Sequence, residues 1–131
     1  MKQLFDSSSI INLCAKKRLD KLIQGSTLSL ALYEVGNAVW KQVHLKRSLT
    51  REEGEKALST LVEVLKRMNV ILIEDCSAVL SIAVEEGLTY YDASYIHAAD
   101  RNGLTLITDD ERLSSIAKKY VQTATSSDIE Q

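Results

Sequence analysis

Residues 2–13 read KQLFDSSSIINL, a short apolar run followed by an acid and then by a stretch with helical apolar spacing. Lys2 to Phe5 is predicted to be a β-strand, and Asp6 ends it. Ser7 to Ser9 offer N-caps for a helix over the apolar residues that follow. The stretch therefore predicts a strand that leads directly into a helix, with a carboxylate at the junction.

The rest of the chain continues the same alternation of short apolar runs and helical stretches. Further strands are expected at residues 27–30, 70–73 (a β-branched run that should be buried on both faces), 104–107 and 121–124. Helices are expected at residues 16–23, 31–44, 51–68, 77–86 and 91–102, then from a cap at 109 or 110 as far as 119, with a polar tail after the last strand. This alternation is typical of a parallel sheet covered on both faces. The predicted fold class is α/β, with three layers (α/β/α) and a mostly parallel central sheet of four to five strands.

The composition limits the class of protein. A chain of 131 residues has the length of one domain, so a single domain over residues 1–131 is expected. With 45% hydrophobic and 26% charged residues, the chain is neither disordered, collagenous nor a coiled coil. A net charge of −2 excludes a protein that binds polyanions through overall positive charge. Its apolar runs are too short for a signal peptide or a membrane span, so we expect a cytoplasmic protein without membrane contact.

Carboxylates follow the predicted strands. Asp6 ends the first strand, Asp109 and Asp110 follow residues 104–107, and Glu34 and Asp92 lie near the starts of predicted helices. Helix capping explains Asp6 or Asp110 equally well when each is taken singly. However, the active crevice of a parallel α/β sheet lies at the carboxyl ends of its strands, so we expect several of these acids to share one crevice.

A shared crevice of this kind needs a cation. No Lys or Arg lies beside Asp6, Glu34 or Asp92 in the sequence. Three or four neighbouring carboxylates repel one another unless they are protonated or neutralised. Oxygen ligands favour a hard divalent ion such as Mg²⁺ or Mn²⁺. Such an ion generates hydroxide, holds a phosphate oxygen and makes an acidic pocket attractive to phosphate, which suits phosphodiester hydrolysis.

Four stretches together resemble the PIN domain family, most closely its VapC-like toxin branch. They are LFDSSSIINL (4–13), ALYEVGNAVWK (31–41), LTYYDASYIHAA (88–99) and LITDDERLSSIA (106–117). The resemblance spans nearly the whole chain in the family's order and spacing. It implies a Mg²⁺- or Mn²⁺-dependent endoribonuclease that hydrolyses RNA, the toxin of a type II toxin–antitoxin pair. It also implies a VapB-like antitoxin protein as partner and a homodimer.

The resemblance assigns roles to individual acids. The family's four acids match Asp6, Glu34, Asp92 and Asp110, which are therefore implied to be catalytic. Asp6, Asp92 and Asp110 are implied to bind the metal, and Glu34 either ligates a second ion or orients the attacking water. Asp109 occupies the variable position of the family's Thr-x-Asp motif, so the choice of Asp110 over Asp109 depends on register alone.

Other residues are expected near this site. Ser7 matches the hydroxyl residue that follows the first acid in the family, and Thr108 is expected to bond a carboxylate. A basic cluster at Lys41, Lys46 and Arg47 either is a solvated loop or forms an RNA-binding rim. Trp40 lies off the apolar stripe of its helix, so it packs under the next helix or contacts a second subunit or the antitoxin.

Two other functions are open at this point. A PIN-like scaffold that lacks catalysis is able to bind RNA or protein without cutting, although loss of an acid would be its signature. A phosphoacceptor receiver domain also carries clustered acids at strand ends. That fold needs an Asp after its third strand and a Lys after its last, whereas here Asp75 is present but residues 125–127 contain no Lys.

Overall fold

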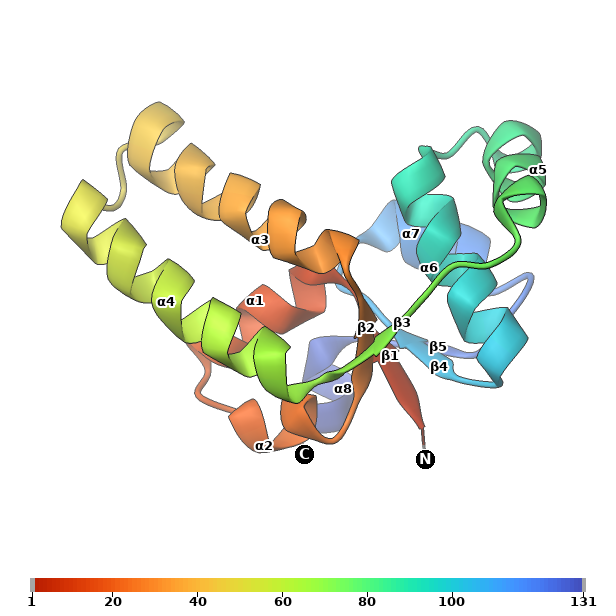
Figure 1. Ribbon diagram of the computed structural model, residues 1–131, viewed down its shortest axis with the longest axis horizontal. Helices are drawn as coiled ribbons and strands as arrows, with labels where there is room; N and C mark the ends of the chain where they lie inside the picture. The colour runs from red at the N-terminus through yellow and green to blue at the C-terminus, as the bar shows by residue number, and fades with distance from the viewer. Residues whose placement is uncertain (1, 131) are drawn as a thin grey trace.

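The computed structural model describes residues 2–130, which form a five-stranded sheet with helices on both faces (Figure 1). The strands are β1 (Gln3–Phe5), β2 (Ser26–Leu28), β3 (Asn69–Ile71), β4 (Thr105–Ile107) and β5 (Thr123–Ala124). Their order across the sheet is β3-β2-β1-β4-β5, and every neighbouring pair is parallel. The predicted parallel α/β sheet is confirmed.

The helices fall into two groups along the chain. The first group is α1 (Ser7–Ala15), α2 (Leu19–Ile23), α3 (Leu30–Trp40), the π-helical turn η1 (Lys41–Leu45) and α4 (Arg51–Arg67). The second is α5 (Cys76–Glu86), α6 (Tyr90–Asn102), α7 (Glu111–Ala117) and α8 (Ser126–Glu130). Between residues 2 and 130, none of these helices combines the length and hydropathy that a membrane span requires.

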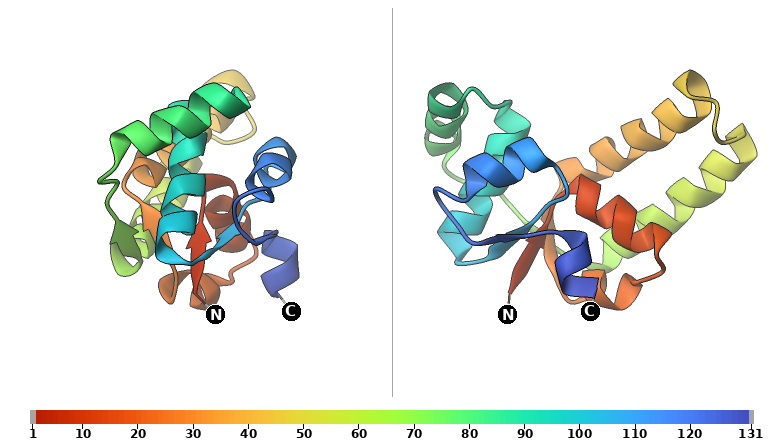
Figure 2. Two further views of the ribbon diagram at one scale, coloured as in Figure 1. Left: turned by 90° about the vertical axis from the view of Figure 1, so that its right-hand side faces the viewer. Right: turned by 180° about the vertical axis from the view of Figure 1, so that it is seen from behind.

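The sheet separates two hydrophobic cores, because neighbouring side chains on a strand point to opposite faces. On one face, Leu4 and Leu106 pack with residues of α6 and α7. On the other face, Phe5 and Ile107 pack with residues of α1, α3 and α4. The three predicted layers are therefore present, and α8 lies against α1 on the second face (Figure 2).

At the edges of this fold, one sequence expectation is wrong and one helix was not predicted. The run Val70–Ile73 is not a strand buried on both faces, because β3 is an edge strand and Leu72 beyond it is 74% exposed. The polar tail contains α8, a helix that the sequence analysis did not predict. Thr125 and Asp128 cap that helix reciprocally: each backbone N–H donates to the other side chain, at 2.8 and 3.2 Å.

α3, η1 and α4 form an antiparallel pair that projects from the sheet, which we call the arm (Figures 1 and 2). A capping box starts α4: Thr50 Oγ1 accepts from Glu53 N at 3.1 Å, and Glu53 Oε1 accepts from Thr50 N at 2.9 Å. Close contact of α4 with η1 depends on Gly54, where a Cβ would lie 2.5 Å from Cγ2 of Val43. The lack of a side chain at Gly54 thus allows η1 and α4 to pack closely at the outer end of the arm.

Two helical glycines of the arm should respond oppositely to the same substitution. Gly36 in α3 has nothing within 4 Å of an added Cβ. Gly36→Ala should therefore raise the free energy of unfolding by about 1 kcal/mol, the helix-propensity difference. Gly54→Ala has the same intrinsic gain but forces Val43 away, so we expect a net loss of stability. Urea unfolding of both variants measures this; equal shifts would contradict the close packing of η1 on α4.

Candidate active site

The candidate site lies where the strand order reverses, between β1 and β4. In open parallel sheets the crevice at such a switch point, outside the carboxyl ends of the strands, is where ligands bind. Asp6 directly follows β1 and Thr108 directly follows β4. The backbone N–H of Asp6 donates to Ile107 O at 3.1 Å, which continues the pairing of the two strands up to the first acid.

Asp6 is buried, at 4% exposure, and its carboxylate accepts three hydrogen bonds from nearby donors. Oδ1 accepts from Ser8 Oγ at 2.8 Å and from Ser9 N at 2.9 Å, and Oδ2 accepts from Thr108 Oγ1 at 2.5 Å. Asp6 itself is therefore the N-cap of α1, a role that the sequence pattern assigned to the serines. Burial raises the pKa of Asp6 although these hydrogen bonds lower it.

Two further carboxylates come from two different helices, Glu34 from α3 and Asp92 from the first turn of α6. Burial raises the pKa of Glu34, and the charges of Asp6 and Asp92 raise it further. Burial likewise raises the pKa of Asp92, followed by the charges of Asp110 and Asp6. The structure thus brings together all four acids that the sequence selected, close enough to repel one another.

The two consecutive acids after Thr108 differ in what they contact. Asp109 Oδ2 accepts from Asn12 Nδ2 at 2.7 Å and its Oδ1 accepts from Ser126 N at 2.8 Å. Although burial raises the pKa of Asp109, these hydrogen bonds lower it below its usual value. Asp110 instead caps α7, accepting from Leu113 N at 3.0 Å, and its charge acts on Asp92. Both Asp109 oxygens are thus used to hold α1 and the start of α8, whereas Asp110 belongs to the acid group.

Two supporting hydroxyl groups were missed by the sequence reasoning. Ser8, rather than Ser7, bonds Asp6, and its Oγ also accepts from Asp109 N at 3.0 Å. Ser7 acts on Glu34, whose pKa its hydrogen bond lowers. Tyr95 is buried and donates from Oη to Glu34 Oε1 at 2.8 Å. Its position three residues after an acid, on the same helix face, is the signal that could have found it.

The donor chemistry fits a hard divalent cation. All four candidate ligands are carboxylates, and no Lys or Arg within residues 2–130 forms an ion pair with any of them. Arg112 lowers the pKa of Asp92 from nearby, but its Nη2 donates to Gly87 O at 2.8 Å. In the described part of the chain, no three acidic, histidine or cysteine side chains stand in a ready-made ligand arrangement.

The predicted basic rim lies on the arm and not inside the crevice. Lys41, Lys46 and Arg47 are all exposed, around the turn that joins α3 to α4. Trp40 is 48% exposed, so it does not pack under the next helix. Its ring stacks on His44 instead, with centroids 5.4 Å apart and an interplanar angle of 17°.

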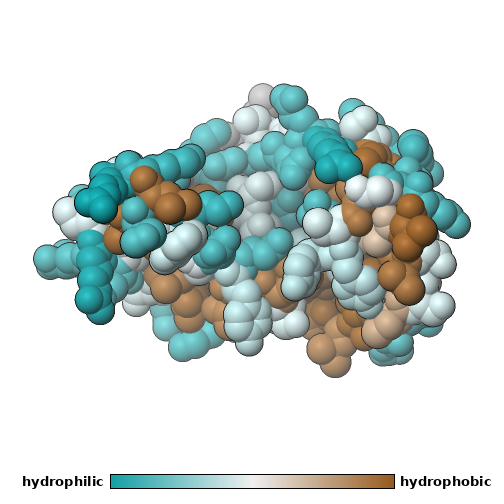
Figure 3. Space-filling view, turned by 90° about the horizontal axis from the view of Figure 1, so that it is seen from above, coloured by the Kyte–Doolittle hydropathy of each residue, from teal (hydrophilic) through white to brown (hydrophobic). Residues whose placement is uncertain are grey.

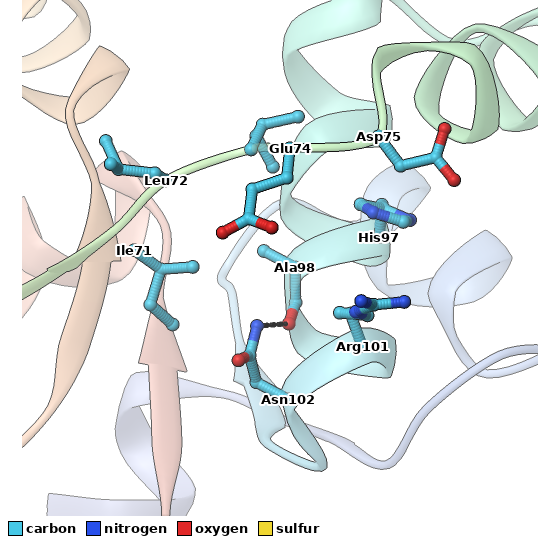
Figure 4. Close-up of a pocket in the computed structure, with 9 residues that line it drawn as sticks. Ile71, Leu72, Glu74, Asp75, His97, Ala98, Arg101 and Asn102 are labelled. Atoms are coloured by element: carbon cyan, nitrogen blue, oxygen red, sulfur yellow. Dashed lines mark hydrogen bonds between the residues drawn. The ribbon is translucent and has the colours of Figure 1, made fainter.

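Another hollow, of about 540 Å³, lies away from the acids between the β3–α5 connection and α6 (Figure 4). Its walls include Ile71 and Glu74 on one side and His97 and Arg101 on the other. His97 and Arg101 are one helical turn apart and project from the same side of α6 (Figure 4). None of the four grouped carboxylates lines it, so it is separate from the candidate site.

The family model for the PIN domain matches residues 3–119. This chain belongs to the PIN domain family. Exonuclease VapC9 from Pyrobaculum aerophilum is 36% identical over 127 residues, which cover 93% of this chain and 90% of that protein. Ribonuclease VapC3 from the same organism is 34% identical over 124 residues, covering 87% of this chain and 93% of that protein.

Solved structures agree with this PIN assignment. PAE2754 from Pyrobaculum aerophilum superposes with a TM-score of 0.83 at 30% identity, covering 98% of this chain and 92% of its own. VapBC2 from Rickettsia felis, solved with a promoter DNA fragment, has a TM-score of 0.65 at 17% identity over 95% of this chain and 98% of its own, a likeness of fold alone. The strand order also differs from the 2-1-3-4-5 order of receiver-like folds, so the phosphoacceptor alternative is wrong.

Glu34→Gln should stabilise the PIN fold at neutral pH. The folded chain holds the Glu34 proton more tightly than the unfolded chain does, so ionisation of Glu34 destabilises the fold. Gln removes that charge and still accepts from Tyr95. The gain should be complete at pH 7 and disappear as the pH falls through the raised pKa of Glu34 towards its ordinary 4.5. Urea unfolding between pH 4 and pH 7 measures the difference.

Glu86→Gln is the matched control of opposite sign. Hydrogen bonds from Tyr120 and Lys119 lower the pKa of Glu86, so its charge stabilises the fold. This variant should lose stability at pH 7. If Glu34→Gln loses stability there as well, the repulsion among the grouped acids is not what governs the site.

Proposed function

We propose that residues 1–131 form a single PIN-like nuclease domain that cuts RNA internally with Mg²⁺ or Mn²⁺, as the toxin of a toxin–antitoxin pair. One observation carries the proposal: four carboxylates from distant parts of the chain gather at the switch point of a PIN sheet, where the charges of Asp6 and Asp92 raise the pKa of Glu34 and those of Asp110 and Asp6 raise the pKa of Asp92. Relatives that share more than a third of their residues are named exonuclease and ribonuclease. The alternative of a non-catalytic binding module would be favoured by loss of an acid, and all four are present.

Asp6, Asp92 and Asp110 are the residues that we assign to the metal ion. When bound, the ion supplies Lewis-acid activation of a phosphate and of a water molecule. Thr108 and Ser8 keep the Asp6 carboxylate in place through their hydroxyl hydrogen bonds. Both carboxylate oxygens of Asp109 accept hydrogen bonds, from Asn12 in α1 and from Ser126 at the start of α8. We therefore assign the role of the family's fourth acid to Asp110.

Glu34 is assigned to the attacking water, or to a second ion. Its raised pKa makes it a better proton acceptor than an exposed glutamate, which suits a residue that orients and deprotonates water. Tyr95 fixes one of its oxygens at 2.8 Å. The water attacks phosphorus in line with the 3′ oxygen: a new P–O bond forms, the P–O3′ bond breaks, Glu34 accepts the proton of the water, and the leaving 3′ oxygen takes up a proton from solvent. The products are a 5′-phosphate and a 3′-hydroxyl.

Partner surfaces are also proposed. An apolar groove of about 350 Å³ runs between α1, α3 and α4, lined in part by Ile11, Val39 and Leu61, and it suits an antitoxin segment. Exposed hydrophobic residues gather over α5, on the right of Figure 3, among them Leu80 and Val84. We propose that this surface contributes to a homodimer. The likeness to VapBC2 is one of fold, so it supports a protein partner for this chain by analogy alone.

Cleavage of RNA by the purified protein should depend on Mg²⁺ or Mn²⁺ and stop in EDTA. Asp6→Asn and Asp92→Asn should each lower the rate by roughly 100-fold or more, because each removes a charged ligand from the site. Asp109→Asn is the matched control: its carboxylate holds structure, so activity should remain. Gel analysis of labelled RNA, with a metal titration, measures all of these.

Persistent cutting in EDTA would contradict the metal mechanism. Loss of activity in Asp109→Asn with full activity in Asp110→Asn would reverse the assignment of the fourth acid. In cells, expression without the partner should arrest growth, and Asp92→Asn should relieve the arrest. Equal toxicity of the two forms would point to an effect other than catalysis.

Tyr95→Phe should distinguish an effect on the position of Glu34 from an effect on RNA binding. It removes only the hydroxyl that holds Glu34, so we expect kcat to fall roughly tenfold with KM for RNA unchanged. Tyr120→Phe removes a similar bond, from Tyr120 Oη to Glu86 Oε2 at 2.6 Å, outside the crevice. That control should leave kcat unchanged. A similar fall in both variants, or a rise in KM alone, would show that Tyr95 does not act through Glu34.

A further inference from the structure

Three aromatic residues share the solvent face of the arm's first helix. Tyr33 is 76% exposed, Trp40 is 48% exposed, and His44 is exposed and stacked on Trp40. The spacing of seven and then four residues places all three on one side of α3 and η1. We call this set the aromatic ridge. Core-facing positions of α3, such as Val35, lie on the other side.

The ridge begins at the proposed site and leads away from it. Tyr33 directly precedes Glu34, and Trp40 lies about 10 Å further along the helix axis. Gly36 lies between the two rings on the same side, with nothing within 4 Å of where its Cβ would be. This leaves an open gap between two exposed rings. The strip of helix between the ridge and Glu34 carries the exposed polar residues Asn37 and Lys41.

Cations surround the outer end of the ridge. The π-turn closes with Lys46 N donating to Lys41 O at 2.9 Å, and Arg47 follows in the left-handed region at φ 52°. Neither lysine nor Arg47 forms an ion pair within residues 2–130. Two of the acids that start α4 already have partners: Glu55 pairs with Arg51, and Glu53 accepts a hydrogen bond from Thr50 N. Glu52 is the third acid of this turn. The cations beside the ridge are therefore available to an anionic ligand.

We propose that the aromatic ridge binds single-stranded RNA by base stacking and leads the strand towards the acids. Stacking on exposed aromatic rings, with cations along the phosphate backbone, is how proteins bind single strands without regard to sequence. Exposed aromatic rings also occur in protein interfaces, but the cations beside this ridge, which have no ion-pair partners within the described residues, match a phosphate backbone. The proposal rests on the proposed function, because it names the form of RNA that reaches that site.

Trp40 is the only tryptophan of the chain, so its fluorescence reports directly on the ridge. The experiment titrates the full-length protein with a mixed-sequence single-stranded RNA of 20 nucleotides in EDTA, so that binding is measured without metal. We expect the emission of Trp40 to be quenched as bases stack on its free face. The same RNA as a duplex, whose bases are not exposed for stacking, should quench it far less.

Substitutions then separate stacking from other contacts. Trp40→Leu keeps bulk but loses the ring, and Tyr33→Leu does the same nearer the site. Each should weaken binding, followed by anisotropy of labelled RNA, by about five- to a hundred-fold, while Trp40→Phe should retain most of it. Leu45→Ala is the matched control, since Leu45 is an exposed, non-aromatic residue of the same arm. Lys41→Ala should lower the salt dependence of binding by about 0.7 in log–log slope.

Three results would overturn the proposal: no quenching by single-stranded RNA, equal quenching by the duplex, or equal weakening by Trp40→Leu and Leu45→Ala. A blue shift of Trp40 emission as the protein is concentrated, with no response to RNA, would overturn it too by making the ridge a contact between copies of the chain. Because the binding is measured in EDTA, absence of RNA cleavage would refute the proposed function alone. Cleavage with unchanged KM in Trp40→Leu would refute the ridge alone.

Discussion

One hydroxyl group joins the two central strands of this PIN fold at the point where the strand order reverses. Thr108 Oγ1 donates to Asp6 Oδ2 and accepts from Asp110 N at 3.1 Å. Through these two bonds it fixes the N-caps of α1 and α7, since Asp6 and Asp110 are the caps of those helices. The same two residues are therefore both helix caps and members of the acid group. Capping and a catalytic role, which compete as explanations in the sequence, are compatible in the structure.

The carboxylates of the acid group repel one another, and this repulsion lowers the stability of the folded chain. Burial raises the pKa of Asp6, Glu34 and Asp92, and the charges of neighbouring acids raise the pKa of Glu34 and Asp92 further, so the ionised forms destabilise the folded chain at neutral pH. Hydrogen bonds from Ser8, Thr108 and Tyr95 offset part of that cost. The offset is partial because hydroxyl groups donate hydrogen bonds but bring no positive charge. A bound divalent cation is the component that would remove the remaining repulsion, which links metal binding to stability as well as to chemistry.

Most of the fold and the acid group could be predicted from the sequence, because the spacing of apolar residues indicates helices and strands and the ends of parallel strands lie at one edge of a sheet. The alternation of strand and helix predicted the parallel sheet. The positions of the acids after the predicted strands indicated that they would lie close together. The edge position of β3 was not predictable, since an apolar β-branched run reads the same in a central strand and at an edge. The partner of each hydroxyl was also hidden: Ser7, Ser8 and Ser9 are neighbours in sequence, yet only the helix geometry decides which of them reaches Asp6. α8 was missed although Thr125 and Asp128 carried its capping signal.

The acid-bearing helices α3 and α6 share a feature that ties recognition to chemistry. In each, an exposed tyrosine directly precedes the acid: Tyr33 before Glu34, and Tyr91 before Asp92. Consecutive residues on a helix point about 100° apart, so when the carboxylate enters the crevice the preceding ring stands at its rim. An exposed ring therefore stands one residue before an acid on each of the two helices. The helix period alone thus places an aromatic surface on each wall of the candidate site, and on α3 the arm extends it outward to Trp40.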